Sequence, residues 1–167
     1  MANIDHTAAL LRTLFHYDPD TGVFTRKVKT SSRAKLGVPV GTPSGHGHLQ
    51  IRFDGTRHLA HRLAWLYVHG EWPSKLIDHI NGNPTDNRIA NLRDVSASIN
   101  AQNQRSATKK NKRSKLIGAH FHVQSGKFLA HIRLDGVARH LGSFDTEQEA
   151  HEAYIAEKRR VHAGCTI

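Results

Sequence analysis

Cysteine is almost absent from this chain, which has one, Cys165, among 167 residues. No disulfide can form within the chain, and no cysteine-based zinc site is available. The single thiol near the end of the sequence is interpreted as incidental. The absence of disulfides is typical of a reducing compartment, so we expect a cytoplasmic protein.

Long apolar runs are also missing. The longest, residues 63–68, is far too short to cross a bilayer, and the polar first residues do not resemble a signal peptide. We therefore expect no membrane partner. Hydrophobic residues make up 38% and aromatic residues 7% of the chain, so any core must be modest. The length suffices for one ordinary domain or two small ones.

Acidic residues are scarce relative to basic ones. Lys and Arg number 24 against 14 Asp and Glu, which gives a formal charge of +10. This balance predicts a polyanionic partner, and charge alone allows DNA, RNA, an anionic membrane or an acidic protein. Residues 101–115 carry six basic and no acidic residues, as a solvated loop or a phosphate-neutralising linker would. We predict domains at 1–105 and 117–167, joined by a basic linker at 106–116.

The spacing of apolar residues predicts an α+β fold. In the first domain we expect helices at 6–16 and 61–69, strands at 23–28, 48–54 and 57–60, and a loop at 37–47. In the second domain we expect three antiparallel strands at 118–123, 127–134 and 137–143, then a helix at 146–162 that Thr146 caps. Alternation along 127–134 predicts one face against that helix and one face in solvent.

The chemistry-bearing residues gather between positions 77 and 103. Asp78 and His79 end a short apolar strand, a polar loop and a returning strand at 91–95 follow, and a helix after Ser96 carries Asn100. A neutral His can take a proton from water, and carboxylate and amide oxygens suit a hard divalent cation. Neighbours on a strand point to opposite faces, so Asp78 and His79 can share a site only where the strand twists or ends.

The ordered set Asp78-His79, Asn87, Asn91-Leu92-Arg93 and Asn100 resembles the HNH endonucleases, above all the phage and homing subgroup. An upstream His-Arg pair, His61-Arg62 here, strengthens a resemblance that covers roughly residues 10–105. It implies a ββα-metal core at about 76–105 with an N-terminal β-hairpin/helix extension. It also implies that His79 is the general base, that Asp78 and Asn100 bind one Mg²⁺ or Mn²⁺, and that Asn91 steadies the loop. Arg93 contacts the scissile phosphate or pairs with Asp94 or Asp86, and His61 supports the site or is structural.

The second domain resembles the AP2 domain in its Leu-Gly-x-Phe-Asp-Thr and Glu-Ala-x-x-Ala-Tyr elements, across residues 116–164. The resemblance implies three strands packed on one helix, with the exposed sheet face in the major groove of double-stranded DNA. The chain departs from the family pattern where histidines replace several expected Arg and Trp positions. The resemblance therefore does not extend to sequence-specific readout, and affinity is expected to rise as pH falls. The candidate DNA contacts in the linker and sheet are Arg105, Lys109, Lys110, Lys112, Arg113, Lys115, His120, His122, Lys127, His131, Arg133 and His140.

The sequence thus predicts a phage-like or homing-type DNA endonuclease acting in a bacterial host cell, as a monomer or a dimer assembled on DNA. A DNA-binding transcriptional regulator with an inactive nuclease core fits the charge and the second domain equally well. An interaction protein structured by zinc would need a metal held by several of the 14 histidines.

Overall fold

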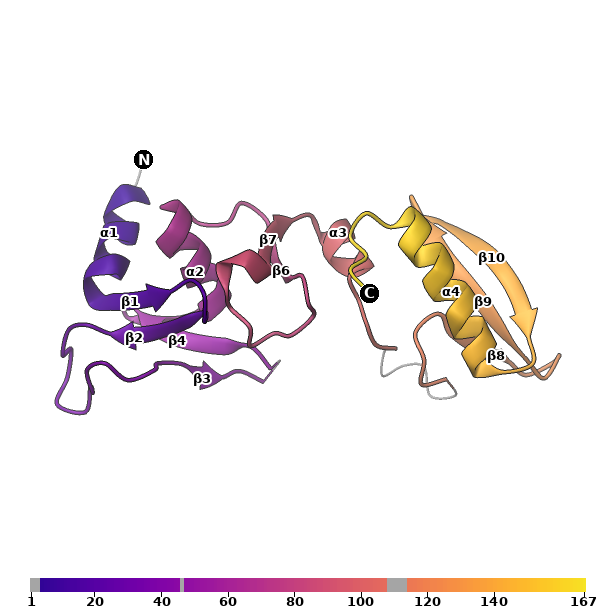
Figure 1. The fold of residues 1–167 in the computed structure, drawn as a ribbon, viewed down its shortest axis with the longest axis horizontal. Helices are drawn as coiled ribbons and strands as arrows, with labels where there is room; N and C mark the ends of the chain where they lie inside the picture. The colour runs from indigo at the N-terminus through magenta and orange to yellow at the C-terminus, as the bar shows by residue number, and fades with distance from the viewer. Residues whose placement is uncertain (1–3, 46, 108–113) are drawn as a thin grey trace. The chain divides into compact units, whose positions relative to one another are not determined.

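The chain divides into two compact units, Met1–Ala97 and Ser98–Ile167, and each is described by itself. The computed structural model describes residues 4–45, 47–107 and 114–167 (Figure 1). The division between the units falls within α3 (Ala97–Gln102), upstream of the stretch predicted as a linker. No described helix is long and apolar enough to span a membrane.

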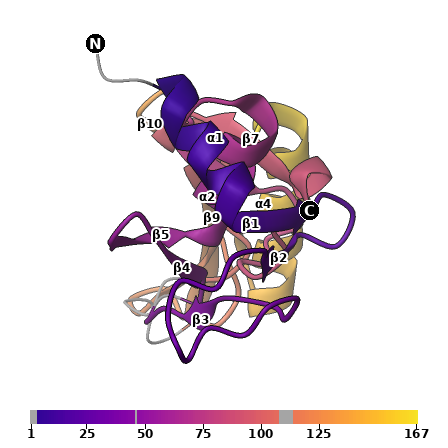
Figure 2. The same ribbon diagram turned by 90° about the vertical axis from the view of Figure 1, so that its left-hand side faces the viewer.

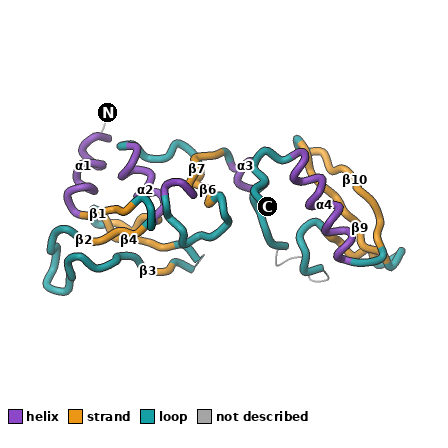
Figure 3. Tube along the Cα trace, in the orientation of Figure 1, coloured by secondary structure: helices purple, strands orange, loops and turns teal. Residues whose placement is uncertain are grey.

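The first unit combines helices with small antiparallel sheets, in agreement with the α+β class. Its elements are α1 (Ile4–Leu14), β1 (Phe15–Asp18), β2 (Val23–Arg26), β3 (Thr42–Pro43), β4 (Leu49–Phe53), β5 (Thr56–Leu59), α2 (Ala60–His69), β6 (Leu76–His79), the 3-10 helix η1 (Ile89–Asn91) and β7 (Leu92–Val95). β1 pairs with β2, β6 pairs with β7, and β3, β4 and β5 form a three-stranded sheet in that order. Figures 1 and 3 show α1 and α2 on one side of β1, β2 and β4.

The first helix ends earlier than its apolar spacing predicts. Phe15 and His16, expected in the helix, open β1 instead, and Figure 2 shows α1 leading directly into this strand. Phe15 and Tyr17 are both buried against Phe24, at ring-centroid distances of 6.3 and 4.7 Å. Residues two apart share a face on a strand but not on a helix, so only the strand buries both rings.

The sheet of β3, β4 and β5 depends on one tight turn. Asp54 and Gly55 have positive φ values of 47° and 76°, as the two central residues of a type I′ hairpin require. Ile51 and Phe53 on β4 enter the core while Arg52 faces solvent. The stretch predicted as a loop at 37–47 contains the short strand β3, which pairs with β4 at Pro43 and Leu49.

The second unit is a three-stranded antiparallel sheet packed on one helix. β8 (Ala119–His122), β9 (Lys127–Leu134) and β10 (Val137–Phe144) lie in the order β10-β9-β8, and α4 (Glu147–Val161) contacts all three strands. The predicted cap is confirmed: Thr146 Oγ1 accepts from the backbone N–H of Glu149, and the Glu149 carboxylate accepts from the N–H of Thr146.

Candidate active site

The strand pair β6–β7 sets the first contact of the site. Asp78 and Arg93 lie directly opposite each other in the antiparallel register, so their side chains share a face. Oδ2 of Asp78 accepts from Nε of Arg93 at 2.8 Å, and Nη2 of Arg93 lies 2.7 Å from the same oxygen.

The sequence offered Asp94 and Asp86 as partners of Arg93, and both bind other groups. Asp94 accepts from the backbone of Ser74 and Lys75, and Asp86 pairs with Arg88. Arg93 is thus the counter-ion of Asp78.

His79 occupies the last position of β6, where the strand ends and the chain turns at Gly82. Its side chain is buried, and Nε2 lies 3.3 Å from Oδ1 of Asn87. Nδ2 of Asn87 donates to the carbonyl of Thr85 at 3.3 Å, so the amide oxygen faces the imidazole. Nε2 of His79 therefore donates, and Nδ1 carries the lone pair. Burial lowers the pKa of His79, while the hydrogen bond with Asn87 opposes this shift.

Hydrogen bonds from Asn91 and Tyr17 and a close contact with Gly22 hold the loop that carries Asn87. Oδ1 of Asn91 accepts from the N–H of Asn81 at 2.9 Å, and Nδ2 of Asn91 donates to the carbonyl of Asp86 at 2.8 Å. The hydroxyl of Tyr17 donates to the carbonyl of Asn87 at 2.7 Å. A Cβ on Gly22 would lie 2.4 Å from the backbone nitrogen of Arg88, so the hairpin β1–β2 approaches this loop as closely as a glycine allows. The N-terminal hairpin thereby positions the partner of His79.

Two further histidines pack around His79. One ring nitrogen of each of His48, His61 and His79 lies within 4.8 Å of those of the other two. The ring centroids of His61 and His79 are 5.0 Å apart, and those of His48 and His79 are 5.7 Å apart. Burial, and next the neighbouring rings of His79 and His48, lower the pKa of His61 to about 3. Burial and the neighbouring rings thus favour the neutral imidazole at His61 and at His79.

The two predicted metal ligands fall in different units. Asp78 is buried in the first unit, whereas Asn100 is a half-buried residue of α3 in the second unit. The pairing of Asp78 with Asn100 therefore stays a prediction. The donor chemistry at Asp78 fits a hard cation, since a buried carboxylate supplies oxygen ligands. A cation bound there would share this carboxylate with Arg93.

The sheet of the second unit presents the predicted DNA contacts on one face. In the register, His131 lies opposite His140, and Lys127 lies opposite His122. His120 pairs with Leu129, and residues 127, 129, 131 and 133 alternate onto the same side of β9. Ala130 and Ile132, on the other side, are buried. The structure thus brings together His120, His122, Lys127, His131, Arg133 and His140 on the face opposite the core.

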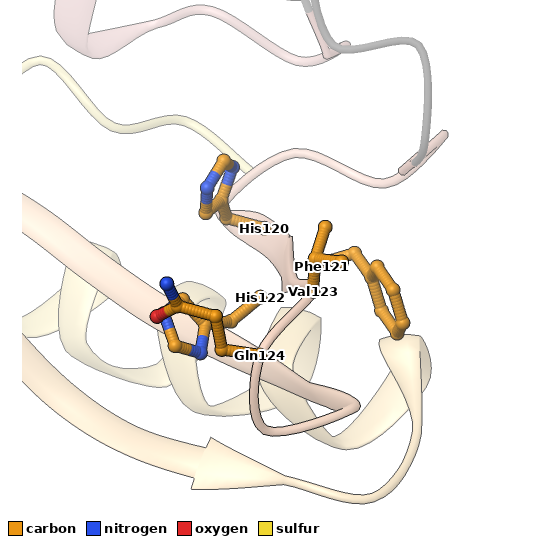
Figure 4. Close-up of a pocket in the computed structure, with 5 residues that line it drawn as sticks. All are labelled: His120, Phe121, His122, Val123 and Gln124. Atoms are coloured by element: carbon orange, nitrogen blue, oxygen red, sulfur yellow. The ribbon is translucent and has the colours of Figure 1, made fainter.

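A shallow hollow of about 430 Å³ lies at the end of this face, lined by residues 120–124. Figure 4 shows His120 and His122 pointing away from Phe121. Of the predicted linker contacts, Arg105 donates to the carbonyl and hydroxyl of Thr166, and Lys115 is exposed. The others, Lys109, Lys110, Lys112 and Arg113, lie outside the described residues.

Residues 58–102 match the family model described as HNH endonuclease. The matched stretch runs from β5 through α3 and contains His61, Asp78, His79, Asn91 and Asn100. It supports an HNH nuclease. No curated protein and no solved structure matches the chain.

Sequence reasoning missed two contacts of the site. His48 lies in a Gly-rich stretch with no motif around it, outside the matched residues, and only the fold brings it to His79. Tyr17 reaches the site loop from 70 residues away in the chain. The only signal in the sequence was the excess of histidine, which does not say which rings meet.

Proposed function

We propose that the protein is a metal-dependent DNA endonuclease of the HNH type, of the phage or homing kind. The single observation that carries the proposal is the buried imidazole of His79, held by Asn87 and placed next in the chain to the Asp78–Arg93 pair, within the stretch that matches HNH endonucleases. Buried, oriented imidazoles with altered pKa values are typical of catalytic bases.

In this proposal His79 takes a proton from the attacking water. Asn87 accepts from Nε2, so the lone pair on Nδ1 receives the proton, and the imidazolium that forms keeps its hydrogen bond to the amide oxygen. The water oxygen attacks phosphorus in line, the bond to the leaving 3′ oxygen breaks, and this oxygen takes a proton from solvent. The resemblance implies products with a 5′-phosphate and a 3′-hydroxyl. Asn91 and Tyr17 act through the loop and are positioning residues.

Asp78, with Asn100 as its proposed partner, would hold one Mg²⁺ or Mn²⁺. When bound, such an ion supplies positive charge that stabilises the phosphoryl oxygens and the leaving group. Arg93 fixes the orientation of the Asp78 carboxylate through two contacts to one oxygen. This is the role we assign to it in place of direct contact with the scissile phosphate.

Removal of the divalent ion is expected to abolish cleavage. Supercoiled plasmid incubated with the protein and Mg²⁺ should be nicked or linearised, with a rate at least about 100-fold above that in excess EDTA. Gel electrophoresis of time points gives both rates, and re-addition of Mg²⁺ to the EDTA sample should restore cleavage. Cleavage that continues in EDTA would exclude the mechanism. Binding without any cleavage would favour a transcriptional regulator with an inactive core.

We further propose that the exposed face of β8, β9 and β10 binds the DNA duplex in an AP2-like manner, with the basic residues of the linker on the phosphates. A three-stranded sheet fits the major groove, and exposed cationic side chains release counterions from the backbone. On this face the basic residues Lys127 and Arg133 lie together with the histidines His120, His122, His131 and His140.

DNA affinity is therefore expected to rise as pH falls. Burial, then the neighbouring rings of His140 and His120, lower the pKa of His131, so this ring gains its proton only below the usual pKa of about 6.5. In the free protein Nδ1 of His140 lies 3.2 Å from Nε2 of His131, a contact that needs one lone pair. A nearby phosphate favours the charged form of His131. We expect affinity for a short duplex to increase by about tenfold between pH 8 and pH 5.5, measured by fluorescence anisotropy at constant salt.

Two variants distinguish the pH dependence that His131 causes from the pH-independent attraction of the other basic residues for DNA. His131→Gln should flatten the pH dependence, whereas Arg133→Gln should weaken binding by a similar factor at every pH because Arg stays charged. An unchanged pH profile in His131→Gln would contradict the assignment of the titrating group.

A further inference from the structure

The cluster of His48, His61 and His79 resembles a ligand set more than a packing arrangement. Its members come from three separate parts of the first unit: His48 precedes β4, His61 lies in α2, and His79 ends β6. His61 and His79 are buried, and His48 is half-buried. Among the described residues, Nδ1 of His61 is buried without a hydrogen-bond partner. A buried nitrogen without a partner lowers the stability of the fold unless it binds a ligand.

We infer that His48, His61 and His79 form a binding site for a borderline transition-metal ion of the Zn²⁺ class. Three imidazoles with an open fourth position are a typical ligand set for zinc. Nitrogens 4.8 Å apart or closer leave an ion at their centre about 2.8 Å from each, so each ring must move by less than about 1 Å to reach the Zn–N distance of about 2.1 Å. With Nδ1 of His79 as the ligand atom, Asn87, which accepts from Nε2, would serve as the outer hydrogen-bond partner common in such sites.

This site differs from the oxygen site at Asp78 in the ion it prefers. Imidazole suits Zn²⁺, Co²⁺ or Ni²⁺, whereas Mg²⁺ selects carboxylate, carbonyl and water oxygens. The consequence rests on the proposed function: an ion held by His79 takes the lone pair that the base needs. Zn²⁺ should therefore inhibit the Mg²⁺-supported reaction, and excess Mg²⁺ should not relieve the inhibition.

Binding is measured first, without DNA or Mg²⁺, on the full chain stripped of metal. Isothermal titration with Zn²⁺ at pH 7.5 should show one site of micromolar affinity or tighter. His48→Gln should weaken that site at least tenfold. His69→Gln, an exposed residue of α2, and His131→Gln, on the sheet face, are matched controls that should change the affinity less than twofold. Thermal melts of the metal-free variants check their folding.

Cobalt provides a readout that needs no variant. One equivalent of Co²⁺ in the unmodified chain should give the visible absorption of a four- or five-coordinate site, and one equivalent of Zn²⁺ should remove it. Absence of this site in the unmodified chain would overturn the inference. So would equal Zn²⁺ affinity in His48→Gln, or loss of the site in His131→Gln instead.

Cleavage is then compared with and without one equivalent of Zn²⁺, each variant against its own zinc-free rate. The unmodified chain should lose at least tenfold and His48→Gln less than twofold. If zinc binds and no zinc-free cleavage exists, the metal site stands and the proposed nuclease function falls. If cleavage proceeds at full rate with zinc bound, the competition for His79 is wrong.

Discussion

Replacement of His79 by Ala is expected to lower the rate of DNA cleavage by about 100-fold to 10,000-fold, the contribution of a positioned general base. The imidazole is buried, oriented by Asn87 and adjacent in sequence to Asp78, and no other described group makes this set of contacts. Single-turnover cleavage of a labelled duplex at saturating protein isolates the chemical step from binding.

Controls decide whether this loss is chemical. Duplex affinity of His79→Ala, measured in Ca²⁺, should match that of the unmodified chain because the base does not hold the DNA. His69→Gln changes an exposed histidine of the same unit and should cleave at the normal rate. A loss of less than about tenfold in His79→Ala, with normal folding and binding, would assign the base to another residue.

Local signals were sufficient for much of the fold. The Asp54-Gly55 turn supplies its own positive φ values, and Thr146 with Glu149 closes both halves of a capping box. Each signal acts within four residues, where propensity and hydrogen bonding decide the structure. The end of α1 was misplaced because burial of Phe15 and Tyr17 against Phe24 is a tertiary effect that overrides helical spacing.

In the candidate site, too, local signals were visible in the sequence and tertiary contacts were not. The Asp-His pair and the spaced asparagines were visible in the sequence, and Asn91 bridges its loop with two hydrogen bonds. The partner of Arg93 was not visible, because it follows from the register of β6 and β7. His48 and Tyr17 depend on how distant elements pack. In the second unit the burial of Lys158 on α4 was likewise not visible in the sequence. Its ammonium group donates to the carbonyl of Gln104.

Substitution of Gly118 by Ala is expected to destabilise the second unit strongly. Gly118 has φ +82°, and a Cβ there would lie 1.9 Å from Cγ of Tyr154 on α4. Overpacking and an unfavourable φ together cost about 2–4 kcal/mol, a large part of the stability of a small domain. Circular dichroism melts and limited proteolysis should show loss of the C-terminal unit well below the unfolding temperature of the unmodified chain.

Gly126→Ala is the matched control. Gly126 has φ +67°, and a Cβ added there would have no atom within 4 Å, so this substitution brings the same backbone strain without the clash. We expect it to cost about 1 kcal/mol. Equal destabilisation by the two substitutions would mean that backbone strain alone decides the effect, and that β8 is not held against α4 by the contact at Tyr154.

The same pair of variants tests whether the second unit binds DNA while the first unit carries out catalysis. If the sheet face holds DNA while His79 performs the chemistry, Gly118→Ala should raise the DNA concentration needed for half-maximal cleavage at least tenfold. The rate at saturating DNA reports on the chemical step. Asp78, His79 and Asn87 lie in the first unit, whereas Asn100, the proposed metal ligand, lies in the unit that this substitution destabilises. We therefore expect the saturated rate to fall as well. An unchanged saturated rate would mean that the second unit only binds DNA, and it would exclude Asn100 as a metal ligand.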